Sequence, residues 1–173
     1  MKRTFLTLLI VLLTAACTRL GSTPQPAASP TGALRLCAAA DLQTSSSSNA
    51  ATGAIQLGVT LINISKSPCV LVEPPQVALN GKSAPLDVQI IDAAADQTPP
   101  APAGVSIVPG NSVIIILVWR NYCGAALTDG PVIHITITTD QALDVRAGLD
   151  AVPRCDAAGA PSTLTVQPYS YPP

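Results

Sequence analysis

The residue types most able to do chemistry in this 173-residue chain are its five cysteines. An odd number of cysteines in an exported protein leaves one thiol that needs a separate role. If Cys17 has that role, an even set remains for disulfides in an oxidising compartment: Cys37, Cys69, Cys123 and Cys155. Four cysteines allow three pairings, which the sequence alone does not decide. We favour Cys37–Cys69 and Cys123–Cys155, each closing a loop of about thirty residues and contributing roughly 3–4 kcal/mol in the chain-entropy model. A zinc knuckle is not expected, because no two cysteines lie two to four residues apart.

Cys17 has the setting of a lipid attachment site. Two basic residues at positions 2 and 3 are followed by an apolar run over residues 5–13, which has the length of a secretion signal and is too short to span a bilayer. Small residues then lead into Cys17, and this pattern resembles the lipobox of bacterial lipoproteins. The resemblance implies a signal peptide at residues 1–16 and a mature protein held by acyl chains on the outer face of the cell membrane, or on an outer membrane if the cell has one. The alternative is an ordinary cleaved signal followed by a coincidental cysteine.

Histidine and carboxylate groups are scarce in the rest of the chain. His134 is the only histidine, so a Ser-His-Asp or Cys-His scheme has one candidate base. It lies in the middle of an expected strand, where a solvent-facing or structurally satisfied histidine is the better interpretation. Four late aspartates could gather around Ca²⁺, but they lack the spacing of a calcium loop: Asp140, Asp144, Asp150 and Asp156. We therefore expect no catalytic, cofactor or metal site, and interpret these aspartates as solvated loop residues.

The overall composition bounds the kind of molecule. Removing the two basic residues of the expected signal leaves seven basic against ten acidic residues, and no basic patch occurs, so nucleic acid is not an expected partner. The scarcity of Glu and Lys, which normally line exposed helix faces, argues against a helical bundle. Residues 17–32 are rich in Pro, Ser and Thr and are predicted to form a flexible tether after the lipidated Cys17. One folded domain is expected over residues 33–173.

The elements that must position these side chains are short strands. Residues 54–64 and 132–138 alternate between apolar and polar side chains, and residues 113–119 form an apolar, β-branched run that should be the most buried strand, with Trp119 in the core. Asn80-Gly81 indicates a hairpin turn. Turn residues separate further expected strands at 33–37, 69–72, 76–79, 86–91, 105–108, 143–145 and 164–167. This pattern predicts an all-β, immunoglobulin-like β-sandwich.

Several of these segments together resemble a known family. The stretch LINISKSPCVL at 61–71 joins a strand, an asparagine, a polar turn and a cysteine. VPG at 108–110 precedes a strand that ends in LVW at 117–119 and is followed by Cys123, while Cys155 precedes LTVQP at 164–168. In combination they resemble the exported bacterial domain of unknown function of the 4232 type, over about residues 36–168. The chain departs from it at 72–75, which read VEPP where such domains often carry Gly-aromatic-Pro. The resemblance implies an immunoglobulin-like fold and, because no activity is established for the family, transfers no catalytic residue.

Three functions are compatible with these features. The leading hypothesis is a cell-envelope lipoprotein, bound to the membrane through Cys17, that displays a non-enzymatic binding or structural module for an unspecified protein or small molecule. The alternative is an inhibitor-type interaction module that uses the proline-stiffened loop 92–104, although this loop lacks aromatic or arginine anchors. The third is an enzyme centred on His134 or on the late aspartates, or a calcium-binding domain. The aromatic segment 169–173 is expected to trail off the last strand.

Overall fold

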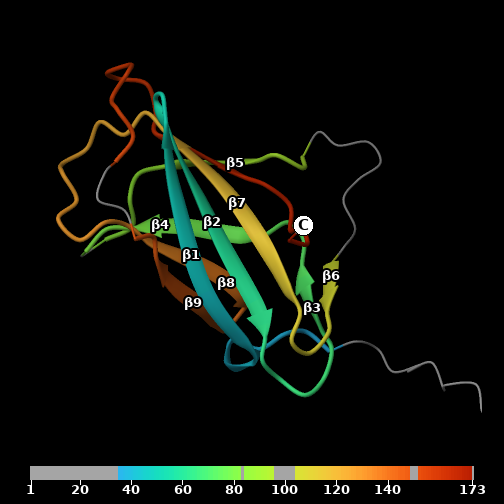
Figure 1. Ribbon diagram of the computed structural model, residues 1–173. Helices are drawn as coiled ribbons and strands as arrows, with labels where there is room; N and C mark the ends of the chain where they lie inside the picture. The colour runs from blue at the N-terminus through green and yellow to red at the C-terminus, as the bar shows by residue number, and fades with distance from the viewer. Residues whose placement is uncertain (1–34, 83, 96–103, 149–151, 173) are drawn as a thin grey trace, which may run out of the picture. The chain divides into compact units, whose positions relative to one another are not determined.

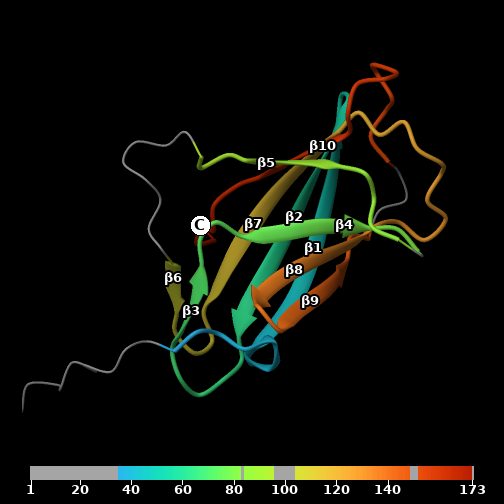
Figure 2. The same ribbon diagram turned by 180° about the vertical axis from the view of Figure 1, so that it is seen from behind.

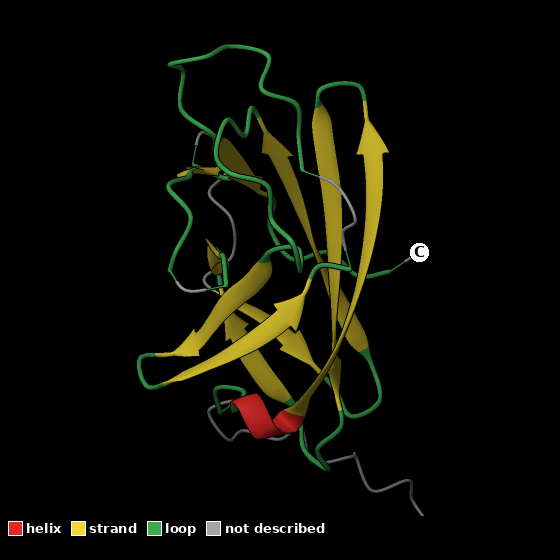
Figure 3. Ribbon diagram, turned by 90° about the vertical axis from the view of Figure 1, so that its left-hand side faces the viewer, coloured by secondary structure: helices red, strands yellow, loops and turns green. Residues whose placement is uncertain are grey.

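The structure of the chain, a computed structural model, describes residues 35–82, 84–95, 104–148 and 152–172 (Figure 1). A single 3-10 turn, η1 (Ala39–Asp41), appears in red in Figure 3, and everything regular after it is β-structure. The strands in chain order are β1 (Leu42–Ala51), β2 (Ala54–Asn63), β3 (Cys69–Val72), β4 (Gln76–Asn80), β5 (Gln89–Asp92), β6 (Gly104–Ile107), β7 (Ser112–Arg120), β8 (Val132–Thr138), β9 (Gln141–Arg146) and β10 (Thr163–Val166). Within these residues no helix is long and apolar enough to cross a membrane.

The strands form two layers around one core. One layer is a five-stranded sheet in the order β1-β2-β7-β10-β5, with antiparallel neighbours except for the parallel pair β5–β10. The other contains the sheet β4-β8-β9 and the pair β3-β6, all antiparallel. β1, β2 and β7 lie in front of β4, β8 and β9 in Figure 1 and behind them in Figure 2. Inward side chains of both layers form one buried cluster, so the prediction of an all-β sandwich is confirmed.

Strand β7 is the centre of the larger sheet. Its alternate residues Val113, Ile115, Leu117 and Trp119 are completely buried, because β2 and β10 flank β7 and the second layer covers its inner face. The indole Nε1 of Trp119 donates a 2.9 Å hydrogen bond to Ser162 Oγ, which satisfies its one polar group inside the core. The intervening apolar residues of β7 lie on the outer face and are only partly buried. The expected core strand is therefore fully buried on one face.

Strand β1 is an element that the sequence pattern did not predict. It pairs with all of β2 through the turn Thr52-Gly53, where Gly53 has a positive φ of 70°. Its residues 45–50 are all exposed, because β1 is the edge of the sheet and covers little of the core. An edge strand of this kind needs no apolar alternation, and serine and asparagine have low strand propensity, so the sequence pattern does not predict a strand here.

One expected strand and one expected hairpin turn also differ in the structure. Of the strand predicted at 33–37, the structure describes residues 35–37, and these form only a single bridge, between Leu36 and Val70. A turn does follow Asn80, with Gly81 N–H bonded to the carbonyl of Ala84, but it does not close a hairpin between neighbouring strands of one sheet. The chain instead crosses to the other layer, where β5 begins at residue 89 rather than 86 and pairs with β10.

The C-terminal segment docks onto the sandwich rather than trailing off it. Ser170 exchanges two backbone hydrogen bonds with Ile114, of 2.8 and 3.0 Å, which extends the β7 pairing beyond β10. Tyr169 is buried, and Tyr171 donates from its hydroxyl to the carbonyl of Ser106 at 2.9 Å. The expectation of a loose tail over residues 169–173 was wrong for 169–171. β10 pairs only with residues 117–120 of β7, so the N–H and carbonyl of Ile114 on that side are open to the C-terminal segment.

Candidate functional site

The loops of the sandwich gather at its two opposite ends. β2 and β7 pair from Ile62↔Ser112 to Ala54↔Arg120, so the ends of this pair are roughly 27 Å apart. We call the lower end in Figure 1 the entry end: it contains residues 35–41, where the described chain begins, with the loops 63–68 and 107–111. The opposite end, at the upper left of Figure 1, is the loop end and contains residues 85–87, 121–130 and 154–162.

Asn63 holds the entry end together. Its side chain is fully buried, and its Nδ2 donates to the carbonyls of Ser67 at 3.0 Å and Ile107 at 2.9 Å. Its Oδ1 accepts from the backbone N–H of Ser65 at 2.9 Å and from Ser65 Oγ at 2.7 Å. The asparagine of the 61–71 stretch therefore ties the turn after β2 to the end of β6.

An ion pair lies on the surface beside this network. Arg35 Nη1 is 2.6 Å from Asp41 Oδ2, and Arg35 Nη2 donates to Ser65 Oγ at 3.1 Å. The hydrogen bond from Arg35 lowers the pKa of the Asp41 carboxyl, and the backbone N–H of Ala38, at 2.7 Å, lowers it further. The pair fixes the first described residues against the loop 63–68 and so sets where the chain enters the domain.

Asn121 has the corresponding place at the loop end. Its φ of 54° lies in the left-handed region, which asparagine tolerates better than most residues. Its Oδ1 accepts from the N–H groups of Asp156 at 3.0 Å and Ala157 at 2.9 Å. Its Nδ2 donates to the carbonyls of Ala157, Ala160 and Pro161 at 3.1 to 3.3 Å. One side chain thereby fixes the loop 156–161.

One disulfide lies at each end. Cys37 is joined to Cys69 and Cys123 to Cys155, with Cα–Cα distances of 4.8 and 4.7 Å and a sequence separation of 32 in both. This is the neighbour-to-neighbour pairing favoured from the sequence. Cys37 and Cys69 are buried, whereas Cys123 and Cys155 are exposed.

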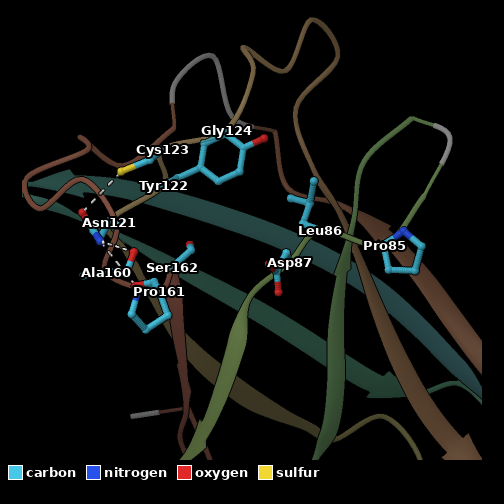
Figure 4. A pocket seen from close by; sticks show the side chains of 11 residues that line it. Pro85, Leu86, Asp87, Asn121, Tyr122, Cys123, Gly124, Ala160, Pro161 and Ser162 are labelled. Atoms are coloured by element: carbon cyan, nitrogen blue, oxygen red, sulfur yellow. Dashed lines mark hydrogen bonds between the residues drawn. The ribbon is translucent and has the colours of Figure 1, made fainter.

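The loop end surrounds an open hollow of about 560 Å³ (Figure 4). In Figure 4, Leu86 and Asp87 lie on one side, and Tyr122 and Pro161 on the other. Asp87 is the only charged residue among the described residues that line it: Pro85, Leu86, Asp87, Asn121, Tyr122, Cys123, Gly124, Gly159, Ala160, Pro161 and Ser162. The hollow thus combines one carboxylate with proline, leucine and tyrosine surfaces.

The other polar groups around the hollow are bonded within the protein. The Tyr122 hydroxyl donates to the carbonyl of Ala125 at 3.0 Å, and its ring lies 5.0 Å from that of Trp119, centroid to centroid. Ser162 Oγ accepts from Trp119 and donates to the carbonyl of Arg120 at 3.1 Å. These bonds shape the hollow and leave it as a preformed surface.

Of His134 and the described late aspartates, the structure joins His134 to Asp144 in a surface pair and gathers no larger cluster. His134 Nδ1 is 2.8 Å from Asp144 Oδ1 across the β8–β9 pair, with side chains 38% and 67% exposed. Asp140 accepts a hydrogen bond from Thr139 Oγ1. Asp156 lies at the loop end, where its Oδ1 is 3.7 Å from Arg154 Nε. In the part of the chain that the structure describes, no three His, Cys, Asp or Glu side chains are grouped to hold a metal ion. Asp150 lies outside the described residues.

The sequence analysis missed a contact between Glu73 and the C-terminal segment. Glu73 Oε1 accepts from the backbone N–H of Tyr169 at 2.9 Å, while Oε2 is buried without a hydrogen-bond partner. Burial raises the pKa of Glu73, the bond from Tyr169 opposes that rise, and the charge of Asp92 adds to it. Burial also raises the pKa of Tyr169 far above its usual value. No sequence signal joins these residues, which lie 96 positions apart.

Two predicted features lie outside the described residues. They are Cys17 with its signal and tether, and residues 96–103 of the loop 92–104. Lipidation of Cys17 and an inhibitor-type role for the loop therefore stay predictions.

Two disulfides, two asparagine-centred networks and two layers of strands define a cross-linked β-sandwich module. The family model described as a domain of unknown function, DUF4232, matches residues 37–170, and the chain belongs to this family. The resemblance noted in the sequence is thereby confirmed. Comparison with curated proteins and with solved structures gave no match.

Proposed function

We propose that this chain is a bacterial cell-envelope lipoprotein, acylated at Cys17, that displays a non-enzymatic β-sandwich as a binding or structural module. The observation that carries the proposal is the placement of the two ends. The chain enters at Arg35, whose guanidinium bonds to the loop 63–68, whereas the hollow lies at the other end of the β2–β7 pair. A molecule anchored before residue 35 can therefore present its hollow away from the anchor.

Attachment to the membrane is supported by residues 1–17. A basic start, an apolar run and small residues before Cys17 form the lipobox pattern. Two or three acyl chains give near-permanent attachment, whereas a single chain would be marginal. The two disulfides fit an oxidising compartment outside the cytoplasm.

A binding role rather than catalysis is supported by the chemistry of the hollow. Asn121, Tyr122 and Ser162 use their polar atoms on backbone or core partners, as described above. Proton transfer needs a titratable group within hydrogen-bond reach of a second reacting group. Asp87 supplies a single carboxylate beside apolar surfaces, which suits a ligand with one hydrogen-bond donor or cation next to an apolar part.

The proposal is tested with the native protein in two steps. Intact mass spectrometry should show acylation at Cys17, and an unmodified Cys17 would reject the lipoprotein part. The purified protein and the variant Ala160→Arg, which places a large side chain in the hollow, are then used to capture partners from envelope extracts. Ser45→Arg, at an exposed position of the edge strand β1 that does not line the hollow, is the matched control. A partner retained by the control and reduced at least tenfold by Ala160→Arg supports the binding module. Equal capture by both variants would reject the hollow as its site.

A further inference from the structure

The entry end carries exposed apolar side chains that the fold does not need. Leu36, Ile64 and Val108 are 51%, 57% and 45% exposed. They are among the large apolar residues most exposed in the described part of the chain. Scattered single cases are normal on a protein surface, so their common location is what matters.

Backbone hydrogen bonds hold the three segments that bear them together. The segment around Leu36 is fixed to β3 by two backbone hydrogen bonds. The N–H of Val70 donates to the carbonyl of Arg35 at 2.9 Å, and the N–H of Cys37 donates to the carbonyl of Val70 at 3.0 Å. Ile64 N–H donates to the carbonyl of Asp41 at 2.8 Å, which joins its turn to η1.

The segment that bears Val108 is joined to the turn that bears Ile64 through Asn63. The N–H of Asn63 donates to the carbonyl of Asn111 at 3.0 Å, and the carbonyl of Asn63 accepts from the N–H of Gly110 at 2.8 Å. Its side chain bonds to the carbonyl of Ile107, the residue before Val108. The three apolar side chains therefore project from a rigid, cross-linked end of the sandwich, which also contains the buried disulfide Cys37–Cys69.

The occupant of this surface follows from where the chain enters. We infer that the entry end rests on the lipid surface to which the protein is anchored, with Leu36, Ile64 and Val108 in contact with the acyl boundary. This inference rests on the proposed acylation of Cys17, which lies 18 residues before Arg35. A chain of that length without regular structure has an average end-to-end distance on the order of 25 Å. Since Arg35 is part of the entry end, this end is the part of the domain at the highest effective concentration near the bilayer.

The charges of the entry end indicate an apolar contact. Arg35 is paired with Asp41, which leaves Lys66 as the one other basic residue within residues 35–41, 63–68 and 107–111. Attraction to anionic lipid requires clusters of basic residues, which this end lacks. Three partly exposed side chains are too few to hold a protein that has no anchor, but they suffice to orient one that is already tethered.

Photolabelling of the native, full-length mature lipoprotein tests the inference. The protein is reconstituted in vesicles of phosphatidylcholine and phosphatidylglycerol that contain a diazirine-bearing phospholipid, irradiated, and mapped by peptide mass spectrometry. Beyond the acylated N-terminal peptide, we expect label to concentrate on the peptides with Leu36, Ile64 and Val108. Ile64→Ser/Val108→Ser should lower this labelling about five- to tenfold. The matched control Ile90→Ser/Ile91→Ser, on the exposed edge strand β5, should leave it unchanged.

Several outcomes separate this inference from the function on which it rests. Label spread evenly over the domain, or unchanged in Ile64→Ser/Val108→Ser, overturns the inference, provided that intact mass shows acylated Cys17. Label at the entry end that is lost in 0.5 M salt also overturns it, because an apolar contact is not screened by salt. A chain without acyl mass rejects the proposed function, and the inference falls with it. Leu36→Ser alone, which changes one side chain at the periphery, should give a partial loss and guards against a folding defect in the double variant.

Discussion

The two ends of this sandwich use the same parts in opposite settings. Each has a disulfide with a sequence separation of 32 and one asparagine whose amide bonds to several loop groups. At the entry end both the disulfide and Asn63 are buried, whereas at the loop end Cys123 and Cys155 are exposed and Asn121 is partly exposed. A disulfide and an asparagine thus stabilise the core at the entry end, and the same pair of features fixes surface loops at the loop end.

Removing each disulfide in turn should give the largest difference in stability between the two ends. Because the two loops have equal length, the chain-entropy contribution should be the same for both, about 3–4 kcal/mol. Cys37→Ala/Cys69→Ala also leaves a space in the core, and should therefore cost about 1–2 kcal/mol more than Cys123→Ala/Cys155→Ala. Chemical denaturation of both variants measures the difference. Equal losses would show that burial of the first disulfide adds nothing to stability.

The same disulfides should also differ in their reaction with reductant. Cys123–Cys155 is accessible to a thiolate and should be reduced at least about tenfold faster than Cys37–Cys69, which an attacking thiol reaches only after local opening. Timed alkylation after exposure to dithiothreitol, followed by peptide mass spectrometry, gives both rates on one sample. Reduction of the buried pair first would contradict the assignment of the two ends.

The asparagines give a second test, of smaller expected size. Asn63→Ala removes four hydrogen bonds and leaves the buried carbonyl of Ile107 without this partner, for an expected loss of about 2–4 kcal/mol. Asn121→Ala removes exposed bonds that water can replace and should cost about 1–2 kcal/mol. Thermal or urea unfolding measures both.

Asn121→Gly is the control that separates backbone from side chain at the loop end. Glycine accepts the φ of 54° without strain, so it should be less destabilising than alanine while losing the same side-chain bonds. If the glycine variant is as unstable as the alanine variant, the loss of stability comes entirely from the lost side-chain hydrogen bonds to the loop 156–161, and backbone strain adds nothing.

The smallest expected effect concerns pH, at a contact of the C-terminal segment. The pKa of Glu73 is raised in the folded protein, so the folded state binds more protons than the unfolded state between the unfolded and folded pKa values. Its contribution to stability is therefore fully present below the unfolded pKa and is lost as pH rises through the folded pKa. Glu73→Gln keeps an oxygen that can accept from Tyr169 and should flatten this part of the stability–pH curve. Wild-type and variant curves of the same shape would contradict the assignment.

The sequence predicted those elements whose burial it encodes. β2 and β8 alternate in their residues as they alternate in exposure, and the apolar run around Ile115 became the central strand. β1 was missed because an exposed edge strand is specified by pairing with its neighbour rather than by an apolar pattern.

The candidate site was less accessible to sequence reasoning. The hollow is lined by three segments around Asp87, Tyr122 and Ala160, and no local pattern shows that they meet. Asn63 belonged to a recognisable motif, but its bonds to Ile107 depend on a contact across 44 positions. The pairing of Glu73 with Tyr169 depends in the same way on the docking of the last residues.

The parallel pair β5–β10 has a consequence for when the protein can fold. Within its sheet β5 pairs with β10 alone, and β10 is also the strand that joins β5 to β7. Since β10 pairs with β5 across 74 positions, at Thr163↔Gln89, the larger sheet stays incomplete until residues 163–166 have been synthesised. Such non-local closure slows folding, and slow folding would keep the chain extended for longer during the export that we propose.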